Sequence, residues 1–218
     1  PRGGESCMNP RISVCIPVYN CQQYVLQAAG SVLAQTQADF ELLIIDNAST
    51  DGTFEKISSL KDGRIRLLRN AENIGAKNNW NKALLHAQGT FVKLLPADDI
   101  IHPECLERQA RILEENSDAA LVACARDIID ETGRRIMTRR FPFGSGKISG
   151  ELALRANAWA GTNVIGEPGA VLFRRSALAQ TTLFDDTFPY LTDLSLWSQL
   201  LLSGGLYAQS EALCAFRV

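Results

Sequence analysis

Residues 40–52, FELLIIDNASTDG, determine which fold class this sequence fits. Phe40–Ile45 is apolar at nearly every position, which is the pattern of a short strand covered on both faces, as in a parallel sheet. Asp46 follows this strand directly. The turn and N-cap residues behind it, Asn47–Gly52, lead into a helix that we expect to run through Leu60. The stretch therefore predicts a buried strand, an acidic residue at its carboxyl end, and then a helix.

Strands and helices alternate on both sides of this stretch. The other predicted strands are Arg11–Val18, Arg64–Leu68, Phe91–Leu95 and Ala119–Ala125. The other predicted helices run from about Cys21 to Gln35, from the residues after Asn73-Ile74-Gly75 to Gly89, and onward from Pro103. Alternation of this kind is typical of a parallel sheet with helices on both faces, so we predict an α/β fold.

The pattern becomes less regular beyond Asp127. There we expect a hairpin turn at Glu131–Gly133, a glycine-rich loop over Phe141–Lys147, a strand at Gly169–Phe173, and a helix over Leu194–Ser203 that Gly204-Gly205 ends. No internal repeat or low-complexity linker divides the chain. We therefore predict a single domain over residues 1–218, made of two halves that meet near residue 126.

The composition is that of an ordinary globular protein, with 46% hydrophobic residues and 22 Lys+Arg against 24 Asp+Glu. The net charge of −2 lacks the positive excess typical of nucleic-acid binding, so we expect no nucleic-acid partner. A local basic cluster consists of Arg134, Arg135, Arg139 and Arg140. A solvated loop is the favoured interpretation of this cluster, and contact with phosphate or a membrane surface is the alternative.

The cysteines and the apolar runs indicate a cellular compartment. Six cysteines occur without a CxxC pair, and most lie in apolar runs, where a reduced thiol behaves as a small hydrophobic group. They are Cys7, Cys15, Cys21, Cys105, Cys124 and Cys214. No run approaches the roughly 18 apolar residues of a membrane span. Residues 1–6 look like a frayed lead-in and not like a signal peptide. We therefore expect a reducing, cytoplasmic location.

Polar residues stand where three of the predicted strands end. These residues are Tyr19-Asn20, Asp46 and Asp98-Asp99. Ligands of open α/β sheets bind outside the carboxyl ends of the strands. Because parallel strands end at the same edge of a sheet, we expect these side chains to converge on one crevice.

Asp98 and Asp99 are adjacent carboxylates, which repel each other unless a cation or water screens them. A hard divalent ion is a natural neutraliser, since Mg²⁺ takes one or two carboxylates plus substrate phosphates. The alternative is that the pair caps the helix that begins near Pro103. The spacing alone leaves both interpretations open.

Several other motifs are excluded by their neighbours. No GxGxxG follows a predicted strand, and Gly146-Lys147 is followed by Ile148 where a P-loop needs Ser or Thr. Neither His86 nor His102 has a partner at metal-ligand spacing. Asn47-Ala48-Ser49 fits a glycosylation acceptor, but chance is the better explanation on a strand-end turn.

Four motifs in order closely resemble the family 2 glycosyltransferases of the GT-A fold. They are Ser13–Asn20 (SVCIPVYN), Leu43–Gly52 (LIIDNASTDG), Asn73-Ile74-Gly75 and Leu95–Asp99 (LPADD). The resemblance runs from about Ile12 to the end of the chain. It implies a Rossmann-like, mostly parallel sheet with helices on both faces, plus a small acceptor-side subregion. Residues 11–126 would form the nucleotide-sugar-binding half and residues 127–218 the acceptor-side half.

The resemblance assigns roles on the donor side. Pro17, Tyr19 and Asp46 would bind the nucleotide base, usually uracil; Asp98 would lie near the ribose, and Asp99 would bind Mn²⁺ or Mg²⁺ that bridges the diphosphate. The remaining donor-binding residues are Asn20, Asn73, Gly75, Lys77 and Asn79. The family commonly has a basic residue directly before an asparagine here, whereas Lys77 stands one place earlier, before Asn78-Asn79.

On the acceptor side, the family carries an acidic pair at the start of a late helix. Tyr190–Trp197 occupies that place, so Asp193 matches the general base and Thr192 stands where the family often has Glu. The alternative is that Thr192 or Asp193 only caps the helix. Gly166 and Gly169 resemble the segment that lines the acceptor side. Relatives often carry a histidine just after the position of Arg217, which here is followed by Val218.

The activity implied is inverting transfer of a sugar from a UDP-sugar to a hydroxyl of a glycan or lipid-linked acceptor. The implied setting is polysaccharide or other cell-surface glycan synthesis, and a peripheral membrane location at the inner face and a homodimer are left open. One rival is a sugar-phosphate nucleotidyltransferase, which usually has a glycine-rich, arginine-containing loop where this chain reads Val18–Gln23. The other is a non-catalytic nucleotide-binding module.

Overall fold

The apolar run at residues 40–45 forms the centre of a parallel half-sheet. A computed structural model describes residues 9–185, 187 and 191–218 of the chain. In it the strand β2 (Phe40–Asp46) is buried at every position. It pairs in parallel with β1 (Ile12–Val18) and β3 (Ile65–Arg69), and β1 pairs in parallel with β4 (Phe91–Leu94). The predicted strands of this half are therefore confirmed, with shifts of one residue at some ends.

The rest of the sheet is mixed. Its order is β3-β2-β1-β4-β9-β6-β10-β5, with β7 on β6 and β8 on β10. The bounds are β5 (Ile100–Ile101), β6 (Ala119–Ile129), β7 (Arg135–Arg139), β8 (Gly146–Ile148), β9 (Val171–Arg174) and β10 (Gly205–Arg217). The strand β9 lies between β4 and β6 and is antiparallel to both. The strands β4 and β6 therefore run in the same direction, although they do not pair with each other. Because β6 and β10 are parallel, the sheet remains mostly parallel, as the sequence predicted.

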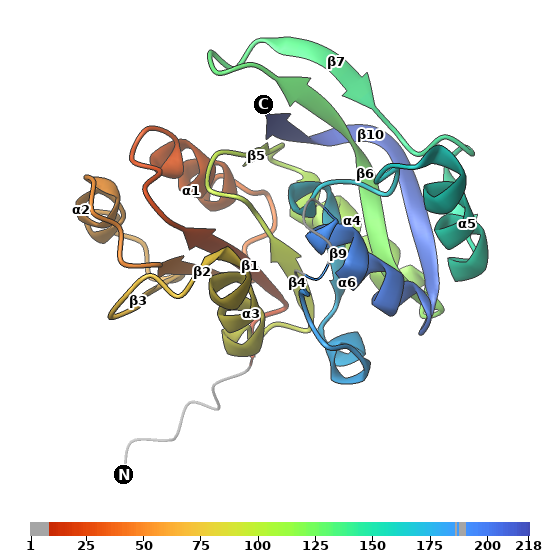
Figure 1. Cartoon of the computed structure of the whole chain (residues 1–218), viewed down its shortest axis with the longest axis horizontal. Helices are drawn as coiled ribbons and strands as arrows, with labels where there is room; N and C mark the ends of the chain where they lie inside the picture. The colour runs from red at the N-terminus through yellow and green to blue at the C-terminus, as the bar shows by residue number, and fades with distance from the viewer. Residues whose placement is uncertain (1–8, 186, 188–190) are drawn as a thin grey trace.

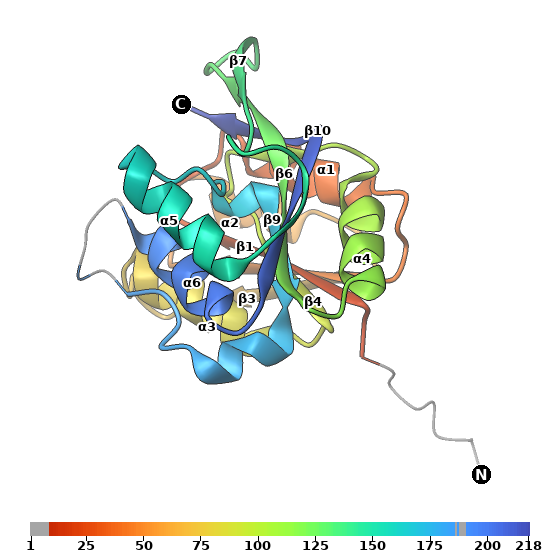
Figure 2. The ribbon, with the colours of Figure 1, turned by 90° about the vertical axis from the view of Figure 1, so that its right-hand side faces the viewer.

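Helices cover both faces of the sheet (Figures 1 and 2). One face carries α1 (Val25–Leu33), α2 (Thr53–Ser58) and α4 (Cys105–Glu115), and the other carries α3 (Ala76–His86), α5 (Gly150–Ala160) and α6 (Thr192–Leu201). The predicted apolar stripe of α4, Leu106, Ala110 and Leu113, has no exposed surface. The chain thus has two hydrophobic cores, one on each side of the sheet.

The strand β10 and the helix α5 are the longest elements that the sequence did not predict. Gly204-Gly205 was expected only to end a helix, but β10 starts at Gly205 and runs for 13 residues. Its polar centre, Gln209-Ser210-Glu211, breaks the apolar pattern, and the pairing with β6 shifts register between Ala208 and Ala212. Both ends of the helix α5 are capped. The Ser149 side chain accepts from the Leu152 N–H at the N-terminus, and Gly161 adopts the left-handed conformation with φ of 62° at the C-terminus.

Two short helices and one turn lie in the C-terminal half of the chain. The 3₁₀ segments η1 (Pro168–Ala170) and η2 (Arg175–Gln180) flank β9, so the predicted strand at Gly169–Phe173 begins two residues late. The hairpin turn predicted at residues 131–133 is confirmed, since the Gly133 N–H donates to the Asp130 carbonyl between β6 and β7. Gly146–Ile148 forms β8 at the end of the expected loop.

The described residues bear on two further expectations. The five described cysteines are free, in agreement with reduced thiols, and Cys7 lies outside the described residues. Within the described part of the chain, none of the helices combines the length and the apolar character needed to cross a bilayer.

Candidate active site

A small cavity of about 160 Å³ gathers five of the predicted donor-binding residues. Pro17 and Tyr19 come from the end of β1, and Asn73, Gly75 and Asn79 come from the start of α3 and the loop before it. The lining is completed by Val18, Asn47, Ala76 and Trp80. The structure therefore brings the first and third motifs together at the carboxyl edge of the sheet.

A network of buried amides holds this cavity in shape. The Asn47 side chain donates to the Asn73 Oδ1 at 2.7 Å and accepts from the Asn70 Nδ2 at 2.8 Å. Asn70 also donates to the Asn79 Oδ1 at 3.0 Å, and Asn79 donates to the Ile45 carbonyl at 3.1 Å. Because buried amides need partners, these bonds tie the ends of β2 and β3 to α3. Gly75 has a φ of 81°, a backbone conformation that residues with a side chain rarely adopt.

Asp46 and Asn20 stabilise the loops beside the small cavity but do not line it. Asp46 has no exposed surface; its carboxylate accepts from the Ser49 N–H at 3.2 Å and pairs with Arg69 at 3.1 Å. The Asn20 Oδ1 accepts from the Thr50 N–H at 2.9 Å. The third predicted residue outside the lining is Lys77, which lies on the first turn of α3.

A larger cavity of about 540 Å³ joins the two acidic motifs. Asp98 enters it from the end of β4 and Asp193 from the first turn of α6. Trp80 lines both this cavity and the small one, so it forms their common wall. The other lining residues are Pro96, Arg139, Gly161, Thr162, Asn163, Glu167, Pro168, Leu191, Thr192 and Phe216.

Asp99 lies buried next to Asp98 and has an unsatisfied oxygen. Its Oδ1 accepts from the Arg217 N–H at 3.0 Å, whereas its Oδ2 has no hydrogen-bond partner among the described residues. Burial raises the pKa of the Asp99 carboxyl well above its usual range. Across the described residues no three His, Cys, Asp or Glu side chains form a metal cluster. The orphaned oxygen beside a second carboxylate fits a hard cation that takes its remaining ligands from a diphosphate.

The helix-capping alternatives for the acidic residues are wrong. The helix α4 begins after Glu104, with β5 between it and the Asp98-Asp99 pair, and no side chain caps it. The N-cap of α6 is Leu191, again without a side-chain cap. Asp193 lies in the first turn of α6 and lines the larger cavity.

The Asp193 carboxylate is held from two sides. Its Oδ1 accepts from the Leu194 N–H at 2.8 Å and its Oδ2 from the Asn163 Nδ2 at 2.7 Å. Burial raises the pKa of this carboxyl above its usual range, although the two donors act in the opposite direction. A carboxylate with a raised pKa in a cavity is suited to take up a proton.

Sequence reasoning missed four residues of the larger cavity: Trp80, Arg139, Asn163 and Glu167. The sequence places Trp80 only within a predicted helix and Arg139 only in a basic cluster. Glu167 lies between Gly166 and Gly169, which are the only residues of that segment to which the sequence analysis gives a role. Tyr190, the first residue of the predicted acidic motif, lies outside the described residues.

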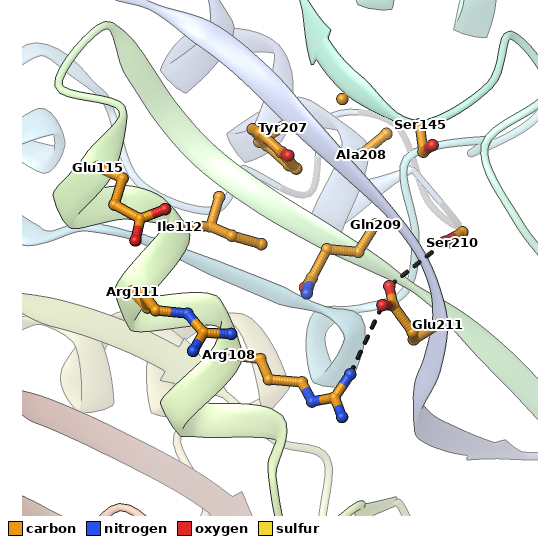
Figure 3. A pocket seen from close by; sticks show the side chains of 11 residues that line it. Arg108, Arg111, Ile112, Glu115, Ser145, Tyr207, Ala208, Gln209, Ser210 and Glu211 are labelled. Atoms are coloured by element: carbon orange, nitrogen blue, oxygen red, sulfur yellow. Dashed lines mark hydrogen bonds and ion pairs between the residues drawn. The ribbon is translucent and has the colours of Figure 1, made fainter.

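A third hollow of about 530 Å³ lies between α4 and β10 (Figure 3). Arg108, Arg111 and Glu115 face it from α4, and Gln209 and Glu211 face it from β10. Arg108 pairs with Glu211 across the hollow at 3.5 Å, and no residue of the four motifs lines it. The candidate active site is therefore the pair of cavities that share Trp80.

Comparisons with known proteins identify the family of this chain. Residues 13–182 match the family described as "Glycosyl transferase family 2". The chain belongs to glycosyltransferase family 2. An uncharacterized glycosyltransferase of Haemophilus influenzae is 29% identical over 98% of this chain and 67% of its own length. An Escherichia coli protein named UDP-Glc:alpha-D-GlcNAc-diphosphoundecaprenol beta-1,3-glucosyltransferase is 38% identical over 49% of this chain and 42% of its own length.

Solved structures show the same fold. Staphylococcus aureus TarS 1-349 with UDP-GlcNAc matches 95% of this chain and 58% of its own, with a TM-score of 0.76 and 20% identity. A Pyrobaculum calidifontis mannosyltransferase with GDP-Man and Mn²⁺ matches 96% and 57%, with a TM-score of 0.70 and 19% identity. The predicted GT-A fold is confirmed. The present chain spans between about two fifths and two thirds of the length of these four proteins.

Proposed function

We propose that this glycosyltransferase moves a sugar from a UDP-sugar to an acceptor hydroxyl with inversion at the anomeric carbon, using Asp193 as the general base. One observation carries the proposal. Trp80 separates a small cavity lined by donor-motif residues from a larger one into which both Asp98 and Asp193 project. A donor bound across this wall would present its reacting carbon to the larger cavity.

The small cavity and its surroundings form the proposed donor site. Pro17 and Tyr19 would contact the uracil. Asp46 would support the base site indirectly, because it accepts a hydrogen bond from the Ser49 N–H and so holds the neighbouring loop. The remaining donor-side residues of the proposal are Asn20, Asn73, Gly75, Lys77 and Asn79. Uracil is favoured by the motifs and by the UDP-GlcNAc complex of TarS, a protein of the same fold.

Asp99, next to Asp98, would hold Mn²⁺ or Mg²⁺ through its unsatisfied Oδ2. When bound, the ion would stabilise the departing diphosphate as a Lewis acid. The mannosyltransferase of the same fold that contains Mn²⁺ supports this assignment. Asp98 would act beside it at the ribose, since its carboxylate faces the larger cavity.

In the proposed reaction, the acceptor hydroxyl attacks the anomeric carbon in line with the departing diphosphate. Asp193 takes the hydroxyl proton as the new glycosidic bond forms, and the bond from the anomeric carbon to the diphosphate oxygen breaks with its electron pair. Positioned general-base catalysis contributes on the order of 10²–10⁴-fold. The raised pKa of Asp193 makes it a stronger base than an exposed aspartate.

The acceptor would be a glycan or a lipid-linked sugar in cell-surface glycan synthesis. The E. coli relative whose name includes a diphosphoundecaprenol acceptor supports this setting. A cytoplasmic location, peripheral to the inner face of the membrane, follows from such an acceptor. Peripheral membrane binding and a homodimer stay predictions.

Product analysis with the intact protein tests the proposal. The protein is incubated with Mn²⁺ and a panel of UDP-sugars plus GDP-mannose, and released nucleotides are measured with and without glycan acceptors. Metal-dependent UDP release, abolished by Asp99→Asn and retained by the surface control Asp118→Asn, is the expected result. In a parallel assay with UTP and sugar 1-phosphates, pyrophosphate release would favour a nucleotidyltransferase, and nucleotide binding without release in the first assay would favour a binding module; either outcome overturns the proposal.

A further inference from the structure

The side chain of Asn163 is bonded at both of its polar atoms. Its Oδ1 accepts from the Gly166 N–H at 3.0 Å, and its Nδ2 donates to the Gly166 carbonyl at 2.9 Å and to the Asp193 Oδ2 at 2.7 Å. Because the backbone N–H fixes Oδ1 as the acceptor, the amide can be placed only with its nitrogen toward the carboxylate.

The loop that carries Asn163 is held by the protein core. Arg126, almost fully buried, donates to the Asn163 carbonyl at 3.2 Å and to the Glu167 carboxylate at 2.5 Å. The Trp197 indole, which has no exposed surface, donates to the Gly166 carbonyl at 3.0 Å. Gly166 has φ of 141°, and a side chain there would press on Ala170. Asn163 is thus presented to Asp193 by a rigid frame.

We propose that Asn163 is a positioning residue for the base, donating one hydrogen bond that fixes the Asp193 carboxylate in the orientation in which it faces the acceptor cavity. This inference rests on the proposed function. In many enzymes a further group holds the catalytic base in the orientation that the reaction requires. Nothing in the sequence marks Asn163, which reads there as an ordinary loop residue.

The charged surroundings of Asp193 predict how its titration responds. Glu167 adds to the effect of burial in raising the pKa of Asp193, and the Asn163 amide lowers it. Asp98 and Arg139 line the same cavity, and Arg126 lies behind Glu167. Replacing the amide nitrogen of Asn163 by a carboxylate oxygen removes a donor and adds a like charge, so the pKa of Asp193 should rise further.

The decisive variant is Asn163→Asp, which keeps the oxygen that accepts from the Gly166 N–H and loses the amide nitrogen that donates to the Asp193 Oδ2 and to the Gly166 carbonyl. We expect kcat at neutral pH to fall by on the order of 10²-fold. The acid limb of the kcat profile should move to higher pH, while the KM for the UDP-sugar changes by less than about threefold. Asn163→Ser, whose hydroxyl is too short to span to Asp193, should also lower kcat without the added charge.

Asn157→Asp is the matched control. Asn157 supports the same loop, because its Oδ1 accepts from the Val164 N–H at 2.9 Å and its Nδ2 donates to the Ala153 carbonyl, but it does not bond Asp193. A purely structural loop effect would lower the melting temperature in both variants and leave both pH profiles unchanged. That result, or wild-type kcat in Asn163→Asp, would overturn the inference.

A readout that does not require turnover separates this inference from the proposed function. The Asp193 carboxyl is titrated by ¹³C NMR in the intact wild-type protein, in Asn163→Asp and in Asn157→Asp. A higher Asp193 pKa only in Asn163→Asp supports the positioning role even if no sugar is transferred. If the Asp193 pKa in Asn163→Asp equals that of the wild type, and the wild-type protein transfers sugar, the inference is refuted while the proposed function stays intact.

Discussion

The two cavities that share Trp80 are built in different ways. The small donor cavity lies at the ends of parallel strands, and neutral amides from Asn47, Asn70 and Asn79 link its walls. The larger cavity draws on β4, β7, α6 and β10, which are far apart in the sequence. We infer from this difference that a local strand-end motif can specify the proposed nucleotide site, whereas the proposed catalytic side depends on long-range pairing.

The two sides also differ in charge. None of the described residues that line the small cavity is charged, whereas the larger cavity contains Asp98, Arg139, Glu167 and Asp193. Buried charges are costly unless they are paired and hydrogen-bonded. We therefore expect substitutions and pH changes to affect the acceptor side more strongly than the donor side.

The largest stability effect should come from Arg126→Met. This change would leave Glu167 without its buried partner, at a cost of about 3–5 kcal/mol in the free energy of unfolding. The control Arg155→Met removes a pair whose side chains are 76% and 73% exposed, so it should change stability by less than about 0.5 kcal/mol. Urea denaturation measures both, and equal costs would contradict the expected contrast.

At the small cavity, Asn79→Ala should cost about 1–3 kcal/mol, because it removes the side-chain donor to the buried Ile45 carbonyl and one of the two acceptors of the Asn70 amide. It should also weaken uridine binding, since Asn79 lines the small cavity. Asn78→Ala is the neighbouring control, because Asn78 is exposed and bonds only within its own helix start. Thermal unfolding with and without uridine gives both quantities; the prediction is wrong if the two variants behave alike.

Trp197→Phe should have a smaller effect. The phenyl ring keeps most of the packing but loses the hydrogen bond to the Gly166 carbonyl, a loss of about 1 kcal/mol. For a chain of this size that corresponds to a melting temperature lower by about 2–4 °C. Trp159→Phe, at a position that is 82% exposed, should leave the melting temperature unchanged. A larger effect at Trp159 would contradict the role of the indole in holding the loop.

The pH dependence separates the two sides without any mutation. Because the base must be ionised and burial raises the pKa of Asp193, transfer should be lost as pH falls through that raised pKa, at a higher pH than for an exposed aspartate. Uridine binding should stay constant between about pH 5 and pH 8, since none of the described residues that line the small cavity is Asp, Glu or His. Rate and binding curves that fall together would contradict the separation.

The donor side could be predicted from the sequence because its signals are local. Phe40–Ile45 has the composition of a doubly covered strand, and Asp46 and Asn73 follow strand ends. The loop residues of the motifs then meet simply because the strands are parallel. Only the internal roles of Asp46 and Asn20 required the structure, since side-chain partners such as Arg69 are not visible in a pattern.

The acceptor side could be predicted only in part. Asp193 was found through the motif resemblance, but β9 between β4 and β6 reflects a choice of strand pairing that no local pattern encodes. Because the centre of β10 is polar, the hydrophobic pattern of the sequence does not indicate this 13-residue strand. Asn163 and Glu167 act through contacts with residues 30 and 41 positions away, so their importance has no signal in their own neighbourhood.

The central claim is that donor binding and proton removal are performed by different residues of this glycosyltransferase. The most direct test measures transfer and uridine affinity in Asp193→Asn, a change that keeps the shape of the side chain. We predict that transfer falls by at least about 10²-fold while uridine affinity remains that of the wild type. Full transfer in Asp193→Asn would contradict the account.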